Sequence, residues 1–130
     1  MSVRIQPHGN AAVVTAERRL VVGNRQALKT AVVHELENGR RAVVIDLGET
    51  DLIDSGGLGV LVTLYRQAEE LGGVLVLANL SDELSGLLRL TKLDTIFTVA
   101  GTIQDALELV RGRSDAEVAT PPAAPAARTA

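Results

Sequence analysis

Residues 42–62 of the 130-residue chain read AVVIDLGETDLIDSGGLGVLV, and this stretch decides the class of fold. It opens with an aliphatic run over residues 42–47 that is interrupted only by Asp46, and such a run is typical of a strand that is covered on both faces of a parallel sheet. Its last part begins an apolar pattern over residues 57–71, in which Leu58 and Leu61 recur at helical spacing. A buried strand, a polar loop and a helix in this order predict an α/β domain.

Strands and helices alternate on both sides of this stretch. Residues 3–5 and 12–15 flank a His8-Gly9-Asn10 turn and predict a hairpin. We expect helices over residues 24–38, 57–71 and 81–90, strands over 74–77 and 96–99, and a last helix that starts at the capping-box-like Thr102-x-x-Asp105. Asn24 and Ser81 are the predicted N-caps of the first and third of these helices, and Gly39 ends the first. The fold class is therefore α/β, with a mixed, mostly parallel sheet of about five strands and about four helices.

The length of the chain fits one domain, which we place at residues 1–110. The remaining residues, 111–130, read RGRSDAEVATPPAAPAARTA and are rich in alanine and proline without an apolar period. This composition predicts a flexible C-terminal tail.

Composition and charge exclude several classes of function. A net charge of −3 does not suit a phosphate backbone, and one Phe, one Tyr and no Trp offer few rings for stacking on bases. The absence of cysteine rules out disulfides and thiolate metal sites. No apolar run has the length of a membrane span, and the N-terminal residues do not resemble a signal peptide. We expect a cytoplasmic protein that binds no nucleic acid directly, inserts in no membrane and holds no metal or other cofactor.

The segment of residues 52–60 is the candidate functional site. Ser55 lies at or just before the start of a helix, where unpaired backbone N–H groups and the helix dipole favour a phosphate by roughly 0.3–1 kcal/mol. Gly56 and Gly57 carry no side chains, which would let a kinase or partner approach the backbone. The simpler alternative is that Asp54 or Ser55 only caps the helix, a much commoner role.

Patterns for catalysis are incomplete, so we predict that the protein is not an enzyme. Ile53 stands where a G-x-S-x-G motif needs its first glycine, and both histidines, His8 and His34, precede Ser55 in the chain. Asp46 ends a strand like a phospho-acceptor, but the accompanying acidic pair and lysine are missing. Residues 57–62 match only part of G-x-G-x-x-G. Binding of a nucleotide or another small molecule by this glycine-rich segment stays open as an alternative.

Residues 53–61, IDSGGLGVL, strongly resemble the signature of STAS domains, the family of bacterial anti-sigma factor antagonists, and the likeness extends over roughly residues 3–110. The family pattern is an apolar residue followed by D-S-[ST]-G-L-G-V. Ser55 matches the serine that the family phosphorylates. Three positions depart from the pattern: Gly56 replaces the second hydroxyl residue, Arg18 replaces the glycine of a G-x-L element, and Val21 replaces a frequent acidic residue.

The resemblance implies a partner-switching function. Unphosphorylated Ser55 would permit binding to an anti-sigma factor that is also a serine kinase, phosphorylation would end that binding, and a PP2C-type phosphatase would reset the switch. The implied partner-binding residues are Asp54, Ser55, Gly56, Gly57, Leu58, Leu20, Val21 and Asn24. A STAS scaffold or regulatory subunit of a stressosome or lipid-transport complex, without phosphorylation of Ser55, is the alternative.

Charge makes such a switch plausible. Four carboxylates, those of Asp46, Glu49, Asp51 and Asp54, precede Ser55 closely in the sequence. A phosphate on Ser55 adds a charge of about −1.5 to −2 to them, so we expect electrostatic repulsion to contribute to release of the partner.

Overall fold

The computed structural model describes residues 3–21 and 25–110. The predicted tail, residues 111–130, and the predicted helix cap Asn24 lie outside these described residues. The partner-binding role expected for Asn24 is therefore not addressed by the structure.

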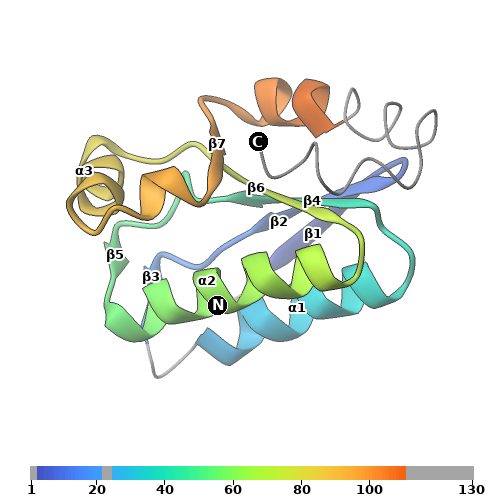
Figure 1. Ribbon diagram of the computed structural model, residues 1–130, viewed down its shortest axis with the longest axis horizontal. Coiled ribbons are helices and arrows are strands. Elements are labelled where there is room, and N and C mark those ends of the chain that lie inside the picture. Colours follow the sequence, from blue (N-terminus) through green and yellow to red (C-terminus); the bar gives the residue numbers. More distant parts are fainter. Residues whose placement is uncertain (1–2, 22–24, 111–130) are drawn as a thin grey trace.

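A five-stranded sheet forms the centre of the molecule, with the strand order β1-β2-β4-β6-β7 (Figure 1). The strands are β1 (Arg4–His8), β2 (Ala11–Thr15), β4 (Ala42–Asp46), β6 (Val74–Ala78) and β7 (Thr98–Ala100). β1 pairs antiparallel with β2, and all the other pairs are parallel. This arrangement confirms the predicted mixed, mostly parallel sheet, in which the most aliphatic runs form the central strands because both of their faces are covered.

Helices cover both faces of the sheet (Figure 1). α1 (Arg25–Glu37) and α2 (Ser55–Glu70) lie side by side on one face, and a helix whose described part is residues 103–110 covers the other. α3 (Asp82–Leu90) lies beyond the carboxyl ends of β4 and β6. The described residues thus contain four α-helices, as predicted, and one additional short 3-10 helix, η1 (Leu93–Thr95).

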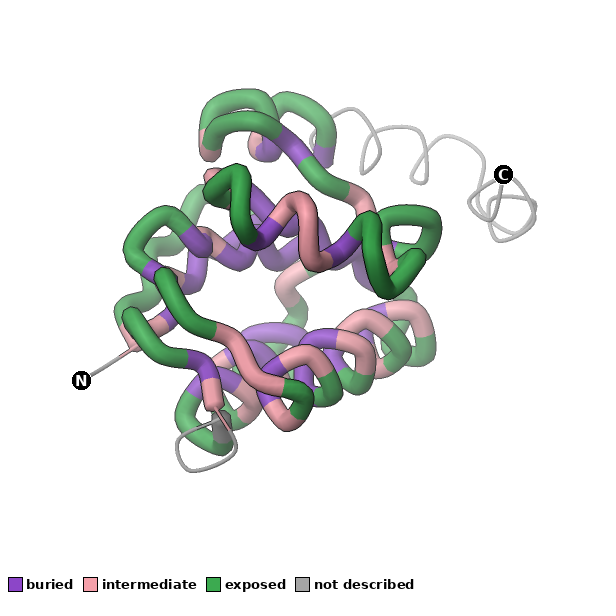
Figure 2. Tube along the Cα trace, turned by 90° about the vertical axis from the view of Figure 1, so that its left-hand side faces the viewer, coloured by how far each residue is buried: buried purple, intermediate pink, exposed green. Residues whose placement is uncertain are grey.

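The two faces of the sheet carry different side chains because successive residues of a strand point to opposite sides. Toward α1 and α2 the sheet presents Val43, Ile45, Leu75 and Leu77, among other large side chains, which join the leucines of the helices in one core. Toward residues 103–110 it presents smaller side chains, mainly alanine and valine. Buried residues therefore line the space between the layers, and exposed residues lie outside (Figure 2).

α1 ends at the predicted Gly39, and α2 also ends at a glycine. Gly39 and Gly72 have φ values of +96° and +79°, and both donate a backbone hydrogen bond back to the preceding turn. Three boundaries differ from the prediction by two or more residues. β1 extends to His8 rather than residue 5, because its pairing with β2 continues as far as His8 and Ala11. α2 begins at Ser55 rather than Gly57, because Asp54 caps it. The last strand begins at Thr98 rather than residue 96, because η1 precedes it and Phe97 enters the core.

Candidate functional site

A small two-stranded parallel ribbon lies just before α2 and was not predicted from the sequence. Its strands are β3 (Arg19–Leu20) and β5 (Leu52–Ile53). The Asp51 N–H donates to the Arg18 carbonyl oxygen at 2.8 Å, and the Asp54 N–H donates to that of Leu20 at 3.3 Å. The ribbon therefore brings the residues before α1 next to the residues that begin α2.

Asp54 is the N-cap of α2. Its backbone is extended (φ −99°, ψ −175°), and its Oδ1 accepts a hydrogen bond of 2.8 Å from the Gly57 N–H. Its carbonyl oxygen accepts the first helical bond, from the Leu58 N–H at 2.9 Å. Of the two cap candidates, Asp54 is thus the cap, and Ser55 is the first residue inside the helix, where it is exposed to solvent.

Gly57 is buried where α2 meets β3. A Cβ atom at this position would lie 2.0 Å from the Leu20 carbonyl oxygen and 3.1 Å from Ile53 Cγ2. Gly57 therefore permits close packing of α2 on the ribbon, a role different from the open approach for a kinase that the sequence suggested. Gly59, only two residues later, has no such neighbour: a Cβ there would meet nothing within 4 Å.

The exposure of the expected partner-binding residues divides them into two groups. Leu20 and Gly57 are buried and belong to the packing beneath the site. Ser55 is exposed, and Asp54, Gly56, Leu58 and Val21 are half-buried around it. The surface that a partner can contact is therefore smaller than the sequence implied, and Leu20 and Gly57 can act only by positioning it.

Two exposed residues lie beside this surface and were not among the partner-binding residues expected from the sequence. Leu52, on β5, is 44% exposed although it is a large hydrophobic residue. Arg18 forms a 3.0 Å ion pair with Asp51 across the ribbon. The positions of Leu52 and Arg18 depend on the pairing of β3 with β5. This pairing could not be predicted, because strands of two residues are too short to show an alternating pattern in the sequence. The departure of Arg18 from the family pattern was the only available signal.

Each of the four carboxylates that precede Ser55 has a partner in the structure, and that of Asp54 is the Gly57 N–H described above. Asp46 Oδ1 accepts hydrogen bonds from the Gly48 N–H (2.9 Å) and from Asn79 Nδ2 (3.0 Å). Glu49 pairs with Arg4, whose pKa is raised by this hydrogen bond, and Asp51 pairs with Arg18. Both ion pairs are solvent-exposed and add little stability. Arginines therefore balance two of the four carboxylates, and Asp54 is the one adjacent to Ser55 in the chain.

The glycine-rich segment does not form a ligand-binding loop. Gly56, Gly57 and Gly59 lie within the first two turns of α2, so the loop that cradles phosphates in nucleotide-binding folds is not present here. Among the described residues, no group of three or more His, Cys, Asp or Glu side chains could hold a metal ion. None of the helices in these same residues combines the length and the apolar character that a membrane span needs.

Comparison with known proteins gives consistent results. The family model described as the STAS domain matches residues 2–106. A Thermotoga neapolitana protein, whose name assigns it to the anti-sigma factor antagonists, is 30% identical over 105 residues, which are 80% of this chain and 93% of the relative.

Solved structures agree as well. One from Thermotoga maritima, also assigned by its name to the anti-sigma factor antagonists, superposes with a TM-score of 0.77 and 27% identity, covering 84% of this chain and 94% of that one. An anti-sigma factor antagonist from Mycobacterium paratuberculosis superposes with a TM-score of 0.76 and 25% identity, covering 85% and 93% of the two chains.

Proposed function

The chain belongs to the STAS domain family, and from this premise we propose that it is an anti-sigma factor antagonist controlled by phosphorylation of Ser55. In the unphosphorylated form it binds an anti-sigma factor that has serine kinase activity, which frees a sigma factor for transcription. Phosphorylation of Ser55 by that kinase ends the binding, and a PP2C-type phosphatase restores it. The protein acts in the cytoplasm by binding rather than by catalysis.

The observation that carries the proposal is the placement of Ser55. It is the first residue of α2, it is exposed, and the neighbouring Asp54 already caps the helix. A kinase can therefore reach the hydroxyl without opening the fold. The helix also keeps its cap hydrogen bond to Gly57 while Ser55 is modified.

The electrostatic effect of a phosphate on Ser55 supports release of a partner. The helix dipole stabilises the phosphate by about 0.3–1 kcal/mol, but it does so in the free and the bound protein alike. A phosphate closed into an interface loses hydration, at an effective cost of several kcal/mol per ion. Converting a nearly all-bound population into a nearly all-free one takes about 5.5 kcal/mol. Dehydration supplies energy of this order without any refolding, and repulsion from Asp54 adds to it only as far as it strengthens when the interface excludes water.

Calorimetry with the cognate anti-sigma factor tests the proposal. The binding partner for this measurement is the anti-sigma factor that co-purifies with the protein from its native cells. We expect Ser55→Ala to bind like wild type and Ser55→Asp to bind at least about 10-fold more weakly, because Asp introduces part of the phosphate's charge. The matched control is Thr63→Asp, which adds the same charge at an exposed position farther along α2.

Intact-mass measurement of the protein from its native cells gives an independent test. A species heavier by one phosphate, which disappears on phosphatase treatment, is expected. Equal affinities of Ser55→Asp and Thr63→Asp for the anti-sigma factor, together with a single unmodified mass, would contradict the proposal and favour a scaffold role.

A further inference from the structure

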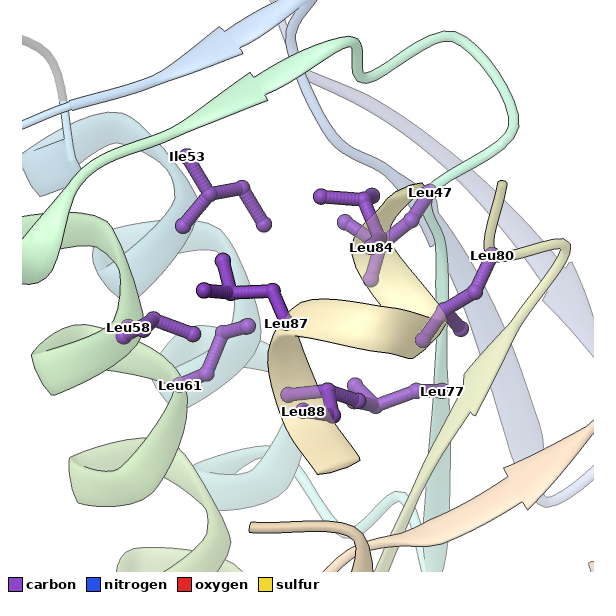
Figure 3. Close-up of a pocket in the computed structure, with 9 residues that line it drawn as sticks. All are labelled: Leu47, Ile53, Leu58, Leu61, Leu77, Leu80, Leu84, Leu87 and Leu88. Atoms are coloured by element: carbon purple, nitrogen blue, oxygen red, sulfur yellow. The ribbon is translucent and has the colours of Figure 1, made fainter. Parts of the chain in front are cut away.

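A narrow apolar pocket lies between α2, α3 and the carboxyl ends of β4 and β6 (Figure 3). Its side chains converge from three sides and are all aliphatic; they belong to Leu47, Ile53, Leu58, Leu61, Leu77, Leu80, Leu84, Leu87 and Leu88, and we call this site the leucine pocket. Its free volume is about 10 Å³, near the lower limit for one water molecule. The lining residues present no polar side chain, so only an apolar group gains by entering.

The leucine pocket has a buried floor and a half-buried rim. The floor consists of Leu47, Leu61, Leu77, Leu84 and Leu88, which are all buried. The rim consists of Ile53, Leu58, Leu80 and Leu87, which are only partly covered. The pocket is therefore accessible from the surface through these four side chains.

The rim is continuous with the surface around Ser55. Ile53 precedes Ser55 by two residues, and Leu58 follows it by one helical turn. A stable interface covers about 800 Å² on each partner. A protein that buries Ser55 in such an interface therefore also covers Ile53 and Leu58.

α3 is the wall of the leucine pocket that can move at the lowest cost. It has nine residues, and its buried side chains are Leu84 and Leu88, whereas α2 has 16 residues and buries five. Helices as short as α3 are not stable by themselves and depend on such contacts. A small outward shift of α3 would widen the pocket while α2 and the sheet stay in place.

We propose that the leucine pocket receives one aliphatic side chain of the anti-sigma factor, and that α3 shifts outward to admit it. This proposal rests on the proposed function, because it takes the anti-sigma factor to dock around Ser55. Side chains that fill apolar pockets near the centre of an interface contribute most of its affinity. The inserted side chain would thus hold the partner beside Ser55, and the phosphate would act at the edge of the same contact.

Two leucines of α3 provide a matched pair of variants. Leu87 lies on the rim of the leucine pocket, whereas Leu90, three residues later, lies outside it and is 82% exposed. We expect Leu87→Asp to weaken binding of the anti-sigma factor at least about 10-fold, and Leu90→Asp to change it less than about twofold. Thermal melts of both variants show whether each is folded.

Methyl NMR on the wild-type protein gives a readout that does not depend on the folding of a variant. With isoleucine δ1 methyls labelled, the Ile53 methyl should show intermolecular NOEs to aliphatic protons of the anti-sigma factor. Ile96 is exposed but is not part of the leucine pocket, so its methyl should show none.

The outcomes separate this inference from the proposed function. The pocket proposal is overturned if Leu87→Asp is folded and binds the anti-sigma factor with wild-type affinity. It is also overturned if the Ile53 methyl shows no intermolecular NOE in a complex that Ser55→Asp weakens. Either result leaves the proposed role of Ser55 intact. If the anti-sigma factor is absent and the Ile53 methyl shows NOEs to the acyl chain of a co-purified lipid, the leucine pocket binds lipid and the pocket proposal is overturned. If Ser55→Asp binds the anti-sigma factor like wild type and the Ile53 methyl still shows intermolecular NOEs, the proposed role of Ser55 is overturned and the pocket proposal is supported.

Discussion

The first turns of α2 and α3 have the same type of cap and different surroundings. Asp54 accepts a hydrogen bond from Gly57 at 2.8 Å, and Ser81 accepts one from Leu84 at 3.1 Å. The first turn of α3 also carries Asp82 and Glu83, which favour the dipole, whereas that of α2 has no acidic residue.

The neighbours of the two turns differ as well. The first turn of α2 packs its Gly57 against the Leu20 carbonyl, so its position depends on a strand that is distant in sequence. The start of α3, in contrast, is specified by adjacent residues, and for that reason the sequence located it correctly. The helix that carries Ser55 therefore begins where tertiary packing, and not only a local cap, fixes the backbone.

The largest effect on the free energy of unfolding is expected from Gly57→Ala. The new Cβ would lie 2.0 Å from the Leu20 carbonyl oxygen, so α2 and β3 must separate, and we expect the free energy of unfolding to fall by about 3 kcal/mol. Urea denaturation measures it. A loss below about 1 kcal/mol would show that the ribbon yields easily and that α2 depends on it no more than α3 does.

The two caps should differ in strength. We expect Asp54→Ala to lower the free energy of unfolding by about 1–2 kcal/mol and Ser81→Ala by about 1 kcal/mol, because Asp54 adds a charge at the positive end of the dipole and Asp82 and Glu83 remain in α3. Denaturation of both variants gives the comparison. Asp54→Asn keeps the cap oxygen and isolates the contribution of the charge, and equal losses for all three variants would contradict this account.

Gly59→Ala should raise the free energy of unfolding, whereas Gly57→Ala should lower it. The position is exposed, and the added Cβ meets nothing within 4 Å. Replacing a helical glycine by alanine should therefore stabilise the protein by about 0.5–1 kcal/mol. A rise in melting temperature tests this expectation, and a fall would mean that flexibility in the second turn of α2 contributes to stability.

The smallest effect on the free energy of unfolding is expected from Gly56→Ser, which restores the hydroxyl of the family pattern. Gly56 lies within α2 and is not among the described glycines with positive φ, which are Gly9, Gly39 and Gly72. Serine is the better helix former, so we expect a gain of about 0.5 kcal/mol or less. A more ordered first turn should also speed phosphorylation of Ser55, measured as the initial rate with the cognate kinase. A stabilised variant that is phosphorylated more slowly would contradict the second expectation.

The sheet and the order of the helices could be predicted because each depends on local signals. The aliphatic run in β4, the positive-φ glycine Gly39 and the cap Ser81 each act within a few residues. The serine of the candidate site was found from its motif. Its exposure at the first position of α2 followed only when the structure showed that Asp54 is the cap.

The remaining features depend on contacts between distant residues. Pairing of β3 with β5, the requirement for Gly57 and the convergence of aliphatic side chains on the leucine pocket all join segments that no sequence window contains. The exposed carboxylates were misjudged for the same reason, since the arginine partners of Glu49 and Asp51 lie 45 and 33 residues away in the sequence.

The ribbon of β3 and β5 also has a consequence for the order of events in folding. Its Arg18–Asp51 pair closes a loop of 33 residues, and the entropy of closing such a loop must be lost before the short ribbon gains its few hydrogen bonds. We therefore expect the ribbon to form on a sheet that is already assembled, so that Gly57 meets Leu20 only then. In a partially folded chain Ser55 would lie on a turn whose position is not fixed, so under the proposed function a kinase would find its substrate geometry only in molecules that have completed folding.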